Sequence, residues 1–502
     1  MAAVFGIDFG TTNSLAALVP PGRRRVSKFL EADRPHPSVV RYHPGGAVTV
    51  GRDAKAQLAS TASGVVDDVV SSPKARLGSG HAYYIAGLTK EPSEVAADIL
   101  RHVRDHADQT LQDPRLHLER AVVTVPVDMD GRARADLRDG ATQAGIEVVQ
   151  FVHEPLAALY GHVRRSSDPS REVSALEGRL VLVFDWGGGT LDITLCRVER
   201  GVLAQILNGG DNEVGGDFFD QALMEDVVGR HREQHQLAAT DVANKPALRE
   251  QCEDAKITLS RRQATTLFVA DGFDAPGSAG TVEQRVTREQ FEAVTRHLVD
   301  RAFSALDRVL ERAGLSERDI SLCLATGGMA AMPAVQRRLV ERFDLGRVPD
   351  IEHADHVIAE GAAWIAHDEA ELQLAKPLEL LHADNTFIQI LPGGTPMPRH
   401  GQEVLQPMTV HCVDPTDGYA RLLFARPTRP RRTGAADKRL PYTCLLVGVH
   451  AQAQPLAERV EVNVAVDPDC IVRISARSSM ARDRREAEVH DLEFGLSLKG
   501  LL

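Results

Sequence analysis

The sequence predicts a two-lobed α/β domain followed by an all-β domain. Two observations predict the lobes: Val4–Ser14 joins an apolar strand to a glycine turn, and Leu180–Thr194 repeats this arrangement. A third observation predicts the all-β part, because strand-like runs alternate with turns beyond residue 381. A chain of 502 residues also exceeds a single hydrophobic core, so two or three domains are expected.

The first stretch, VFGIDFGTTNS, combines an apolar strand with a turn that suits a phosphate group. Asp8 ends the strand, and the turn is Gly10, Thr11, Thr12 and Asn13. Backbone N–H groups and hydroxyls in such a turn can bind phosphate, and a carboxylate beside it can hold a hydrated magnesium ion. A second strand-like run follows, whereas a Walker loop would open a helix. Taken alone, the stretch is equally an ordinary hairpin.

The second stretch, LVLVFDWGGGTLDIT, repeats the same features. Asp185 ends the strand, Gly187–Thr190 form the turn, and Asp192 lies in the next strand. A third glycine turn, Gly327-Gly328, again follows a short apolar strand. Two phosphate-binding hairpins that face each other, with a glycine turn near their base, describe the ATP cleft of the actin, sugar-kinase and heat-shock ATPase superfamily.

Bulk properties exclude several classes of protein. A hydrophobic content of 43% and a charged content of 25% are ordinary for a soluble globular protein. The net charge of −12 argues against a nucleic-acid partner, which requires a basic surface. The cysteines form no CxxC pair, so we expect reduced thiols without a zinc or disulfide framework. No signal peptide and no apolar run of membrane-spanning length is recognised, so a cytoplasmic location without membrane contact is expected.

Strands and helices alternate through the rest of the first lobe. The strand-like runs are Ser38–Val40, Val48–Val50, Ala121–Pro126 and Val148–Val152, and apolar residues at helical spacing follow Ser93 and Ala133. Lys74 lies in a loop, where a solvated lysine is the simplest interpretation. Glu154 follows a strand, a position where α/β folds keep ligand groups. A carboxylate that caps the next helix is the alternative for Glu154.

The second lobe contains one further candidate site and one core helix. Gly215 and Gly216 form a glycine pair flanked by acids. Glu253 and Lys256 share a helix face, and an exposed ion pair would explain both of them. Thr287 and Gln290 form a capping box, and the apolar face that follows predicts a core helix ending at Gly314.

The ordered set of motifs resembles the seventy-kilodalton heat-shock chaperone family. The motifs are DFGTTNS, VVTVP, HEP, DWGGGTLD, VGGDFFD, CEDAKITLS, ATGG and IAEGAA. They occur in the family's order and at its approximate spacing over about the first 370 residues. The resemblance implies an actin-like ATPase domain that binds and hydrolyses Mg-ATP, with ATP/ADP and Mg²⁺ as cofactors.

The resemblance also implies a role for each matching residue. The residues implied in catalysis are Lys74, Asp8, Asp185, Glu154, Thr190 and Asp192, and Lys74 would orient the attacking water. Asp8 and Asp185 would hold magnesium through water. The residues implied in nucleotide binding are Gly10, Thr11, Thr12, Asn13, Gly187, Gly188, Gly189, Thr190, Gly215, Gly216, Glu253, Lys256, Ser260, Gly327 and Gly328. Pro126 and Arg134 match a pair that passes the ATP signal to the peptide-binding domain.

Several positions depart from the family pattern. Ala331 stands where the family has an arginine that stacks on adenine, so the base would be held by Lys256 on one side only. His153 replaces the usual asparagine, Leu156 a threonine, and Trp186 a smaller apolar residue beside the second hairpin. None of these changes removes a phosphate or magnesium group, so ATP binding is still expected.

The predicted domains are residues 1–368 for the ATPase domain, 369–381 for an interdomain linker and 382–502 for a β-sandwich-like substrate domain. Val460, Val462, Val464 and Val466 alternate with other residues, which indicates a half-buried strand. The segment Met480–Val489 is expected to form at most a short helix, so the chain is expected to lack the family's helical lid. The stretch Arg426–Arg439 carries six basic residues and one acid. It can be interpreted as a solvated hairpin tip or as a binding site for an acidic partner.

Two functions follow from the sequence. The first is an ATP-dependent chaperone of the seventy-kilodalton heat-shock type, whose partners would be unfolded or extended protein segments, a J-domain co-chaperone and a nucleotide exchange factor. The second is a nucleotide-controlled module dedicated to one partner, with slow hydrolysis. The acids and Lys74 favour the first function. The second is favoured by the absent lid, by Ala331 and by the linker, in which Gln373 splits the leucine run of the family.

Overall fold

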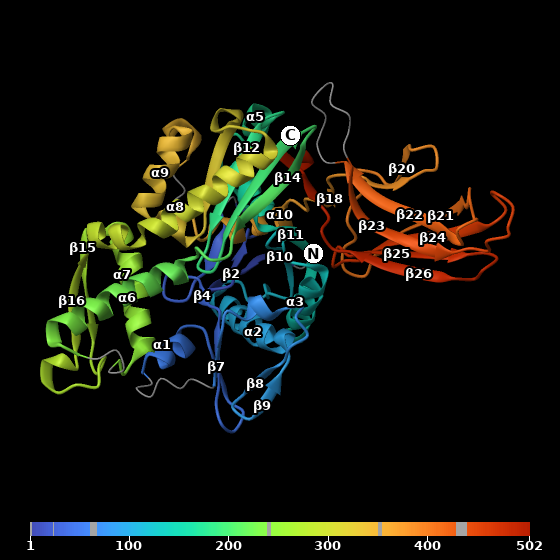
Figure 1. The fold of residues 1–502 in the computed structure, drawn as a ribbon. Coiled ribbons are helices and arrows are strands. Elements are labelled where there is room, and N and C mark those ends of the chain that lie inside the picture. The colour runs from blue at the N-terminus through green and yellow to red at the C-terminus, as the bar shows by residue number, and fades with distance from the viewer. Residues whose placement is uncertain are drawn as a thin grey trace.

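A computed structural model describes residues 3–23, 25–60, 68–237, 242–349, 354–427 and 439–501. Figure 1 shows an α/β body and, beside it, a group of strands formed by the C-terminal part of the chain. Most of the basic stretch 426–439 lies outside the described residues. Over the described ranges, no helix is long and apolar enough to cross a membrane.

The first lobe is built on a mixed sheet with the strand order β11-β10-β1-β2-β3, in which β4 also pairs with β2. Strand β1 is antiparallel to β2 and parallel to β10, so Asp8 lies opposite Thr124. The apolar side chains of β1 are fully buried, which is why this run forms the central strand. The strands are β1 Phe5–Phe9, β2 Asn13–Leu18, β3 Ser27–Phe29, β4 His36–Pro37, β10 Arg120–Val125 and β11 Glu147–His153.

Helices and small sheets surround this first sheet. Helix α10 packs against α4 and β1, and a Cβ at Gly6 would overlap the backbone of Ala363, so only glycine allows this approach. The helices are α1 Arg52–Ser60, α2 Pro92–Thr110, α3 Gly131–Gln143, α4 Glu154–Arg165, α5 Pro169–Leu176 and α10 Val357–His367. The small sheets contain β5 Val39–Tyr42, β6 Val48–Val50, β7 Val69–Ser71, β8 Tyr83–Ile85 and β9 Leu88–Lys90.

The second lobe repeats the connectivity of the first. Strand β12 is antiparallel to β13 and parallel to β17, so Asp185 lies opposite Thr326 as Asp8 lies opposite Thr124. The strands are β12 Leu180–Trp186, β13 Leu191–Glu199, β14 Val202–Asp211, β15 Ala264–Val269, β16 Val282–Thr287 and β17 Ile320–Thr326. The helices are α6 Gly216–His235, α7 Lys245–Arg261, α8 Arg288–Ala313 and α9 Pro333–Phe343. The predicted capping box of Thr287 and Gln290 is confirmed at the start of α8.

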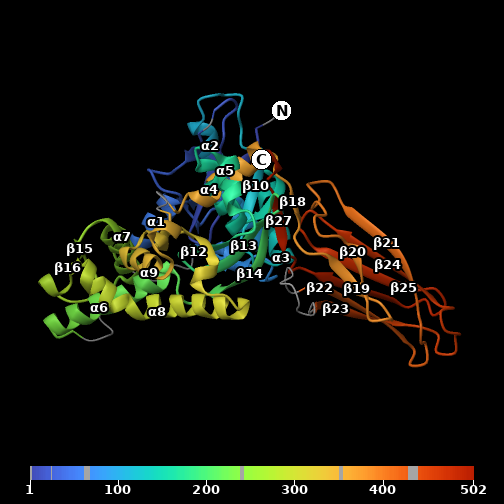
Figure 2. The ribbon, with the colours of Figure 1, turned by 90° about the horizontal axis from the view of Figure 1, so that it is seen from above.

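Two four-stranded antiparallel sheets form most of the C-terminal part, as the sequence predicted (Figure 2). The first contains β19 Leu378–Leu381, β20 Phe387–Leu391, β22 Tyr419–Pro427 and β23 Arg439–Gly448. The second contains β21 Val404–His411, β24 Arg459–Val466, β25 Val472–Ser478 and β26 Arg484–Val489. Both sheets contribute buried residues to one core cluster, including the four alternating valines of β24.

The expectation that Met480–Val489 forms at most a short helix is wrong. Most of this segment is strand β26, which pairs with β25 from Arg477↔Arg484 to Val472↔Val489. Alternating residues such as Ala487 and Val489 contact the core, so the strand register, and not local helix propensity, decides the conformation.

The last strand of the chain returns to the second lobe. Strand β27 (Phe494–Ser497) pairs with β14 on one side and with β18 (Leu372–Leu374) on the other, in a sheet of order β17-β12-β13-β14-β27-β18. Residues of the predicted linker therefore join the second-lobe sheet through the C-terminal strand, and they also contact the first lobe, where the Gln150 side chain on β11 bonds to Ala370 and Leu372. Phe494 and Leu496 are buried in this arrangement.

We predict that Leu496→Asp separates β18 from the second-lobe sheet, because a charged side chain cannot be buried between β14 and β18 without a large desolvation penalty. Hydrogen exchange at the amide of Gln373 should become faster by about tenfold, since β18 loses its pairing with β27, whereas the amides of Leu372 and Leu374 keep their bonds to Gln150 and Thr395. Leu446→Asp, at an exposed position of β23, is the matched control. Unchanged protection in Leu496→Asp would contradict the role of β27.

Candidate functional site

The two glycine hairpins face each other across the lobes. A Cβ at Gly188 would overlap the hydroxyl of Thr12, and a Cβ at Gly189 would lie 3.4 Å from the methyl group of Thr11. The Thr12 hydroxyl is buried and has no hydrogen-bond partner among the described residues. A buried hydroxyl without a partner is costly unless a ligand supplies one. The structure thus brings the two predicted phosphate-binding turns together.

The predicted catalytic residues converge below the hairpins. The Lys74 ammonium donates a 2.8 Å hydrogen bond to Glu154, and both residues are only 8% exposed. Thr124 donates to Asp8 at 3.0 Å, and Thr190 donates to Asp192 at 3.0 Å. Two of the simple interpretations are therefore wrong, namely that Lys74 is solvated and that Glu154 only caps a helix, because the two side chains are buried as a pair.

Burial and mutual repulsion disfavour the ionised form of these acids. Burial raises the pKa of Asp8 to about 7, and the charge of Glu154 adds to this shift while Lys74 opposes it. Burial also raises the pKa of Asp192 to about 7, with contributions from Asp128 and Glu154. For Asp185, burial and then the charges of Glu154 and Asp192 raise the pKa well above its usual range. Asp185 and Asp192 lie directly opposite each other on β12 and β13, where like charges are destabilising.

This donor set fits a magnesium ion and the phosphates that it accompanies. Four carboxylates, from Asp8, Glu154, Asp185 and Asp192, interact electrostatically around the single ammonium of Lys74. A hard dication prefers such oxygen donors and would relieve their repulsion. The glycine turns and the unpartnered Thr12 hydroxyl supply neutral donors for phosphate oxygens.

Three further glycines allow the close approach of backbones at this site. Gly327 has a φ of +82°, and a Cβ there would lie 2.9 Å from a carboxylate oxygen of Asp185. A Cβ at Gly216 would lie 3.0 Å from the Lys256 ammonium, and one at Gly215 would overlap the backbone of Gly189. The amide of Gly216 also donates to the carbonyl of Gly187 at 3.1 Å. Gly328 is exposed at the start of the turn that ends at Ala331, which is also exposed.

Helix α7 does not contain the predicted ion pair between Glu253 and Lys256. Glu253 instead accepts a 2.7 Å bond from Lys55 on α1 of the first lobe, which joins the two lobes. The Lys256 ammonium donates to Asp220 at 2.6 Å and to the carbonyl of Gly216 at 3.1 Å. Ser260 donates only to the carbonyl of Lys256 within its own helix.

Sequence reasoning missed Lys55, Asp220 and Thr124. Asp220 could have been found from the sequence, because it is the last acid of the VGGDFFD motif. Thr124 was visible as the single polar residue in the apolar strand AVVTV. Lys55 carried no local signal, since its partner Glu253 lies in the other lobe.

Two of the atypical residues pack away from the phosphate turns. Trp186 is fully buried, donates to the carbonyl of Val214 at 2.7 Å and contacts Phe184 and Phe219. His153 bonds Gln205 at 2.9 Å, and burial lowers its pKa to about 4, so it is neutral near pH 7. Its ring packs edge-on against Phe494 of β27.

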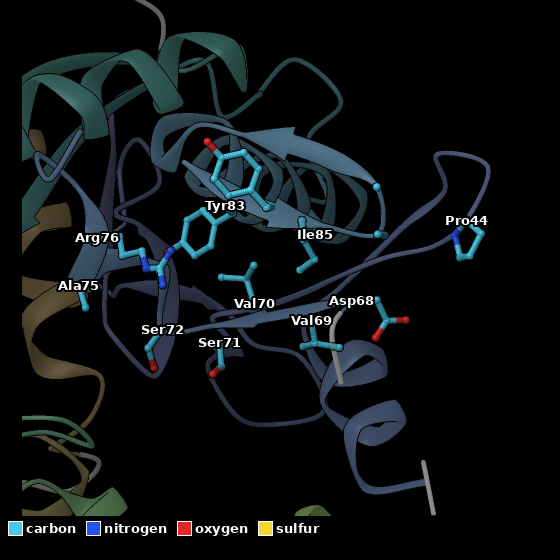
Figure 3. Close-up of a pocket in the computed structure, with 13 residues that line it drawn as sticks. Pro44, Asp68, Val69, Val70, Ser71, Ser72, Ala75, Arg76, Tyr83 and Ile85 are labelled. Carbon is cyan, nitrogen blue, oxygen red and sulfur yellow. The ribbon is translucent and has the colours of Figure 1, made fainter. Parts of the chain in front are cut away.

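A separate surface pocket lies on the outer side of the Lys74 turn (Figure 3). It is lined by residues of β7, the turn Pro73–Arg76 and the β8–β9 hairpin, and the guanidinium of Arg76 stacks on the ring of Tyr83. None of the predicted phosphate-binding residues lines it. The pocket is therefore distinct from the site between the hairpins.

Arg134 connects the first lobe to the C-terminal sheets. It is only 2% exposed, and its guanidinium donates to the carbonyls of Asp469 at 2.6 Å and His490 at 3.2 Å. Arg138, one turn further along α3, bonds the Asp469 carboxylate at 2.6 Å. Pro126 ends the neighbouring strand and accepts a bond from the amide of Met129, whose carbonyl also accepts from Arg134.

The fold and site define a protein with two related lobes and a buried acidic site between facing glycine hairpins. A family model described as "Hsp70 protein" matches residues 4–381. The chain therefore belongs to the Hsp70 family.

Curated relatives agree with this assignment. The chain is 33% identical to "Chaperone protein DnaK" of Metamycoplasma hominis over 364 residues, which is 72% of this chain and 58% of that protein. It is 30% identical to proteins of the same name from Thermotoga petrophila and Thermosipho melanesiensis, over 94% of this chain and 78% of each relative.

We predict that Asp8→Asn weakens magnesium-dependent ATP binding by about tenfold or more, because a charged oxygen ligand is lost. Since the folded protein raises the pKa of Asp8 from 3.8 to about 7, the ligand-free protein loses stability as the pH rises from about 4 to about 7. Asp8→Asn should therefore stabilise the ligand-free protein at pH 8, by on the order of 1 kcal/mol, and less at pH 5.

Calorimetry at pH 8 and thermal unfolding at both pH values test this prediction. Asp274→Asn, at an exposed position of the second lobe, is the control. If Asp8→Asn binds Mg-ATP like the unaltered protein, Asp8 does not belong to the magnesium site.

Proposed function

We propose that this Hsp70-family protein is an ATP-driven chaperone that uses binding and hydrolysis of Mg-ATP to control its hold on unfolded or extended protein segments. The observation that carries the proposal is the convergence of two glycine hairpins on four carboxylates, half-buried or buried, and one buried lysine. Its cofactors would be ATP/ADP and Mg²⁺. Its partners would include a J-domain co-chaperone and a nucleotide exchange factor, as the family membership suggests.

The roles of the residues follow from their positions. Backbone amides and hydroxyls of Gly10–Asn13 and Gly187–Thr190 would hold the phosphates, and Asp8 and Asp185 would hold magnesium through water. Bound magnesium would neutralise charge on the phosphates. The Glu154 carboxylate fixes the Lys74 ammonium, which would orient the attacking water. Because phosphoryl transfer depends on positioning and charge, these fixed groups support slow, controlled hydrolysis.

Nucleotide recognition differs from the family pattern on the base side. Lys256 is held by Asp220, and the exposed Ala331 offers no side chain that could stack on a base. The bond between Lys55 and Glu253 supports closure of the lobes, as it lies between α1 and α7. We propose that phosphate and magnesium contacts supply most of the affinity for the nucleotide.

The C-terminal sheets are proposed to be the substrate domain, a β-sandwich that holds an extended segment by main-chain hydrogen bonds and apolar pockets. Arg134 and Arg138 would carry the nucleotide signal from the first lobe to this domain, since they bind the loop before β25. The comparisons do not support the alternative of a module dedicated to one partner.

We predict that Lys74→Ala leaves ATP bound but slows single-turnover hydrolysis by about a hundredfold or more, because a preorganised charge is lost from the transition state. Lys90→Ala, which removes a more exposed ion pair on the same lobe, is the control. Circular dichroism would show whether the loss of the buried pair with Glu154 disturbs the fold. Equal hydrolysis rates in a folded Lys74→Ala protein would remove Lys74 from the mechanism.

We further predict that Arg134→Ala uncouples the nucleotide from the substrate domain. The substitution removes charge-assisted bonds to Asp469 and His490, so the ATP-induced acceleration of peptide release should fall by about tenfold while ATP affinity is retained. Stopped-flow release of a labelled apolar peptide measures this effect. Arg132→Ala, exposed on the same helix, is the control. An unchanged ATP effect in Arg134→Ala would contradict the proposed route.

A further inference from the structure

A second cluster of ligand-type side chains lies on the first lobe, outside the nucleotide site. It consists of Glu31 in the turn between β3 and β4, His36 on β4, and His102 on α2. One ligand atom from each lies within 4.8 Å of the others. His106, one turn after His102, packs its ring against His36 at 4.8 Å between ring centres.

The hydrogen bonds of His36 leave one of its nitrogens without a partner. His36 is fully buried, and its Nε2 lies 3.0 Å from the carbonyl oxygen of Phe29, so Nε2 carries the proton when the ring is neutral. The lone pair of Nδ1 then faces the carboxylate of Glu31 at 3.5 Å. Two acceptors facing each other in a buried position require either a proton on Nδ1 or a metal ion between them. A metal-binding histidine commonly bonds a backbone carbonyl through its other nitrogen, as His36 does.

The other two histidines also have unpartnered nitrogens. His102 Nε2 and His106 Nδ1 are buried and make no hydrogen bond within the described residues, like His36 Nδ1. Three unsatisfied imidazole nitrogens beside one carboxylate are unusual, because buried polar atoms are almost always bonded.

The distances in the cluster fit a shared ion better than direct hydrogen bonds. Glu31 Oε2 lies 3.5 Å from His36 Nδ1 and 3.7 Å from His102 Nε2, beyond the usual hydrogen-bond range. Ligands at about 2.1 Å from a tetrahedral zinc ion lie about 3.4 Å from each other. The observed separations are therefore close to those of ligands around one zinc ion.

The surroundings keep the space beside these atoms open. Gly51 has a φ of +73°, and a Cβ there would lie 2.7 Å from His102 Nε2 and 2.8 Å from Glu31 Oε2. The Arg52 amide donates to Glu31 Oε2 at 3.2 Å, which orients the carboxylate as outer-shell groups do in metal sites.

We propose that Glu31, His36 and His102 form a three-residue binding site for Zn²⁺ on the first lobe, with the fourth position open to water and His106 beside the ligand group. Imidazole and carboxylate ligands in tetrahedral number suit zinc, whereas the all-oxygen nucleotide site suits magnesium. The zinc site is linked to the first hairpin through β4. Ser38, two residues after His36, donates to the carbonyl of Gly10 at 2.9 Å, and its amide donates to the carbonyl of Thr12 at 2.8 Å. Bound zinc would thus hold the strand that supports the phosphate turn.

The test uses the nucleotide-free full chain, freed of metal with a chelator and titrated with Co²⁺ and then Zn²⁺. Tetrahedral Co²⁺ absorbs visible light, so one equivalent should produce a band that Zn²⁺ removes. His102→Gln, at a half-buried position, should weaken Co²⁺ binding by about tenfold or more, whereas His106→Gln, which lies outside the ligand group, should weaken it less. Zn²⁺ should raise the melting temperature of the unaltered protein and not that of His102→Gln.

Two controls separate this site from other sources of binding. His297→Gln removes an exposed histidine of the second lobe and should bind Co²⁺ like the unaltered protein. Asp8→Asn should also keep the Co²⁺ band, since Asp8 belongs to the nucleotide site. The proposal is overturned if the folded protein binds no Co²⁺, if His102→Gln binds it normally, or if Asp8→Asn abolishes binding. An imidazolium that pairs with Glu31 without metal would give the first of these results.

Discussion

The repulsion among four carboxylates that are half-buried or buried is the constraint on which the rest of the structure depends. Asp8, Asp185 and Asp192 all have raised pKa values because burial and neighbouring charges disfavour their ionised forms. Lys74 is the cation held among them, and it is already bonded to Glu154. Such a site costs stability in the absence of a ligand, and two well-packed lobes must compensate for that cost. The excess negative charge is what makes a dication and its phosphates a suitable ligand.

The duplicated strand connectivity explains how one fold holds these acids in place. In each lobe the acid ends a central strand that pairs with a threonine on a parallel neighbour, Thr124 for Asp8 and Thr326 for Asp185. The hairpin after each acid then faces its counterpart, and glycines allow contacts that a Cβ would prevent. Sheets position the carboxylates rigidly, while the turns present backbone amides. Both properties are needed for a preorganised site.

The sequence predicted what depends on local pattern and failed where distant segments meet. The hairpins, their acids and the core helix α8 are local, and the structure places them as expected. Lys74 and Glu154 could be matched only through the family resemblance, since 80 residues separate them. The predicted ion-pair partner of Glu253 was wrong, because an i,i+3 spacing within one helix cannot reveal a lysine in the other lobe. The pairing of β26 with β25 and the return of β27 depend on tertiary register, which no short window contains.

The return of β27 places Phe494 against the residue that precedes Glu154. Phe494 packs against His153, which directly precedes Glu154, and Leu496 lies between β14 and the linker strand β18. His153 is neutral near pH 7 and is bonded to Gln205 of β14, so it contributes packing contacts and no charge at this position. The linker also contacts the first lobe directly, since the Gln150 side chain on β11 donates to the carbonyl of Ala370 and accepts from the amide of Leu372. The linker strand is therefore held by both lobes. Moving it would break its pairing with β27 and its bonds to β11 together, and not the pairing with β27 alone.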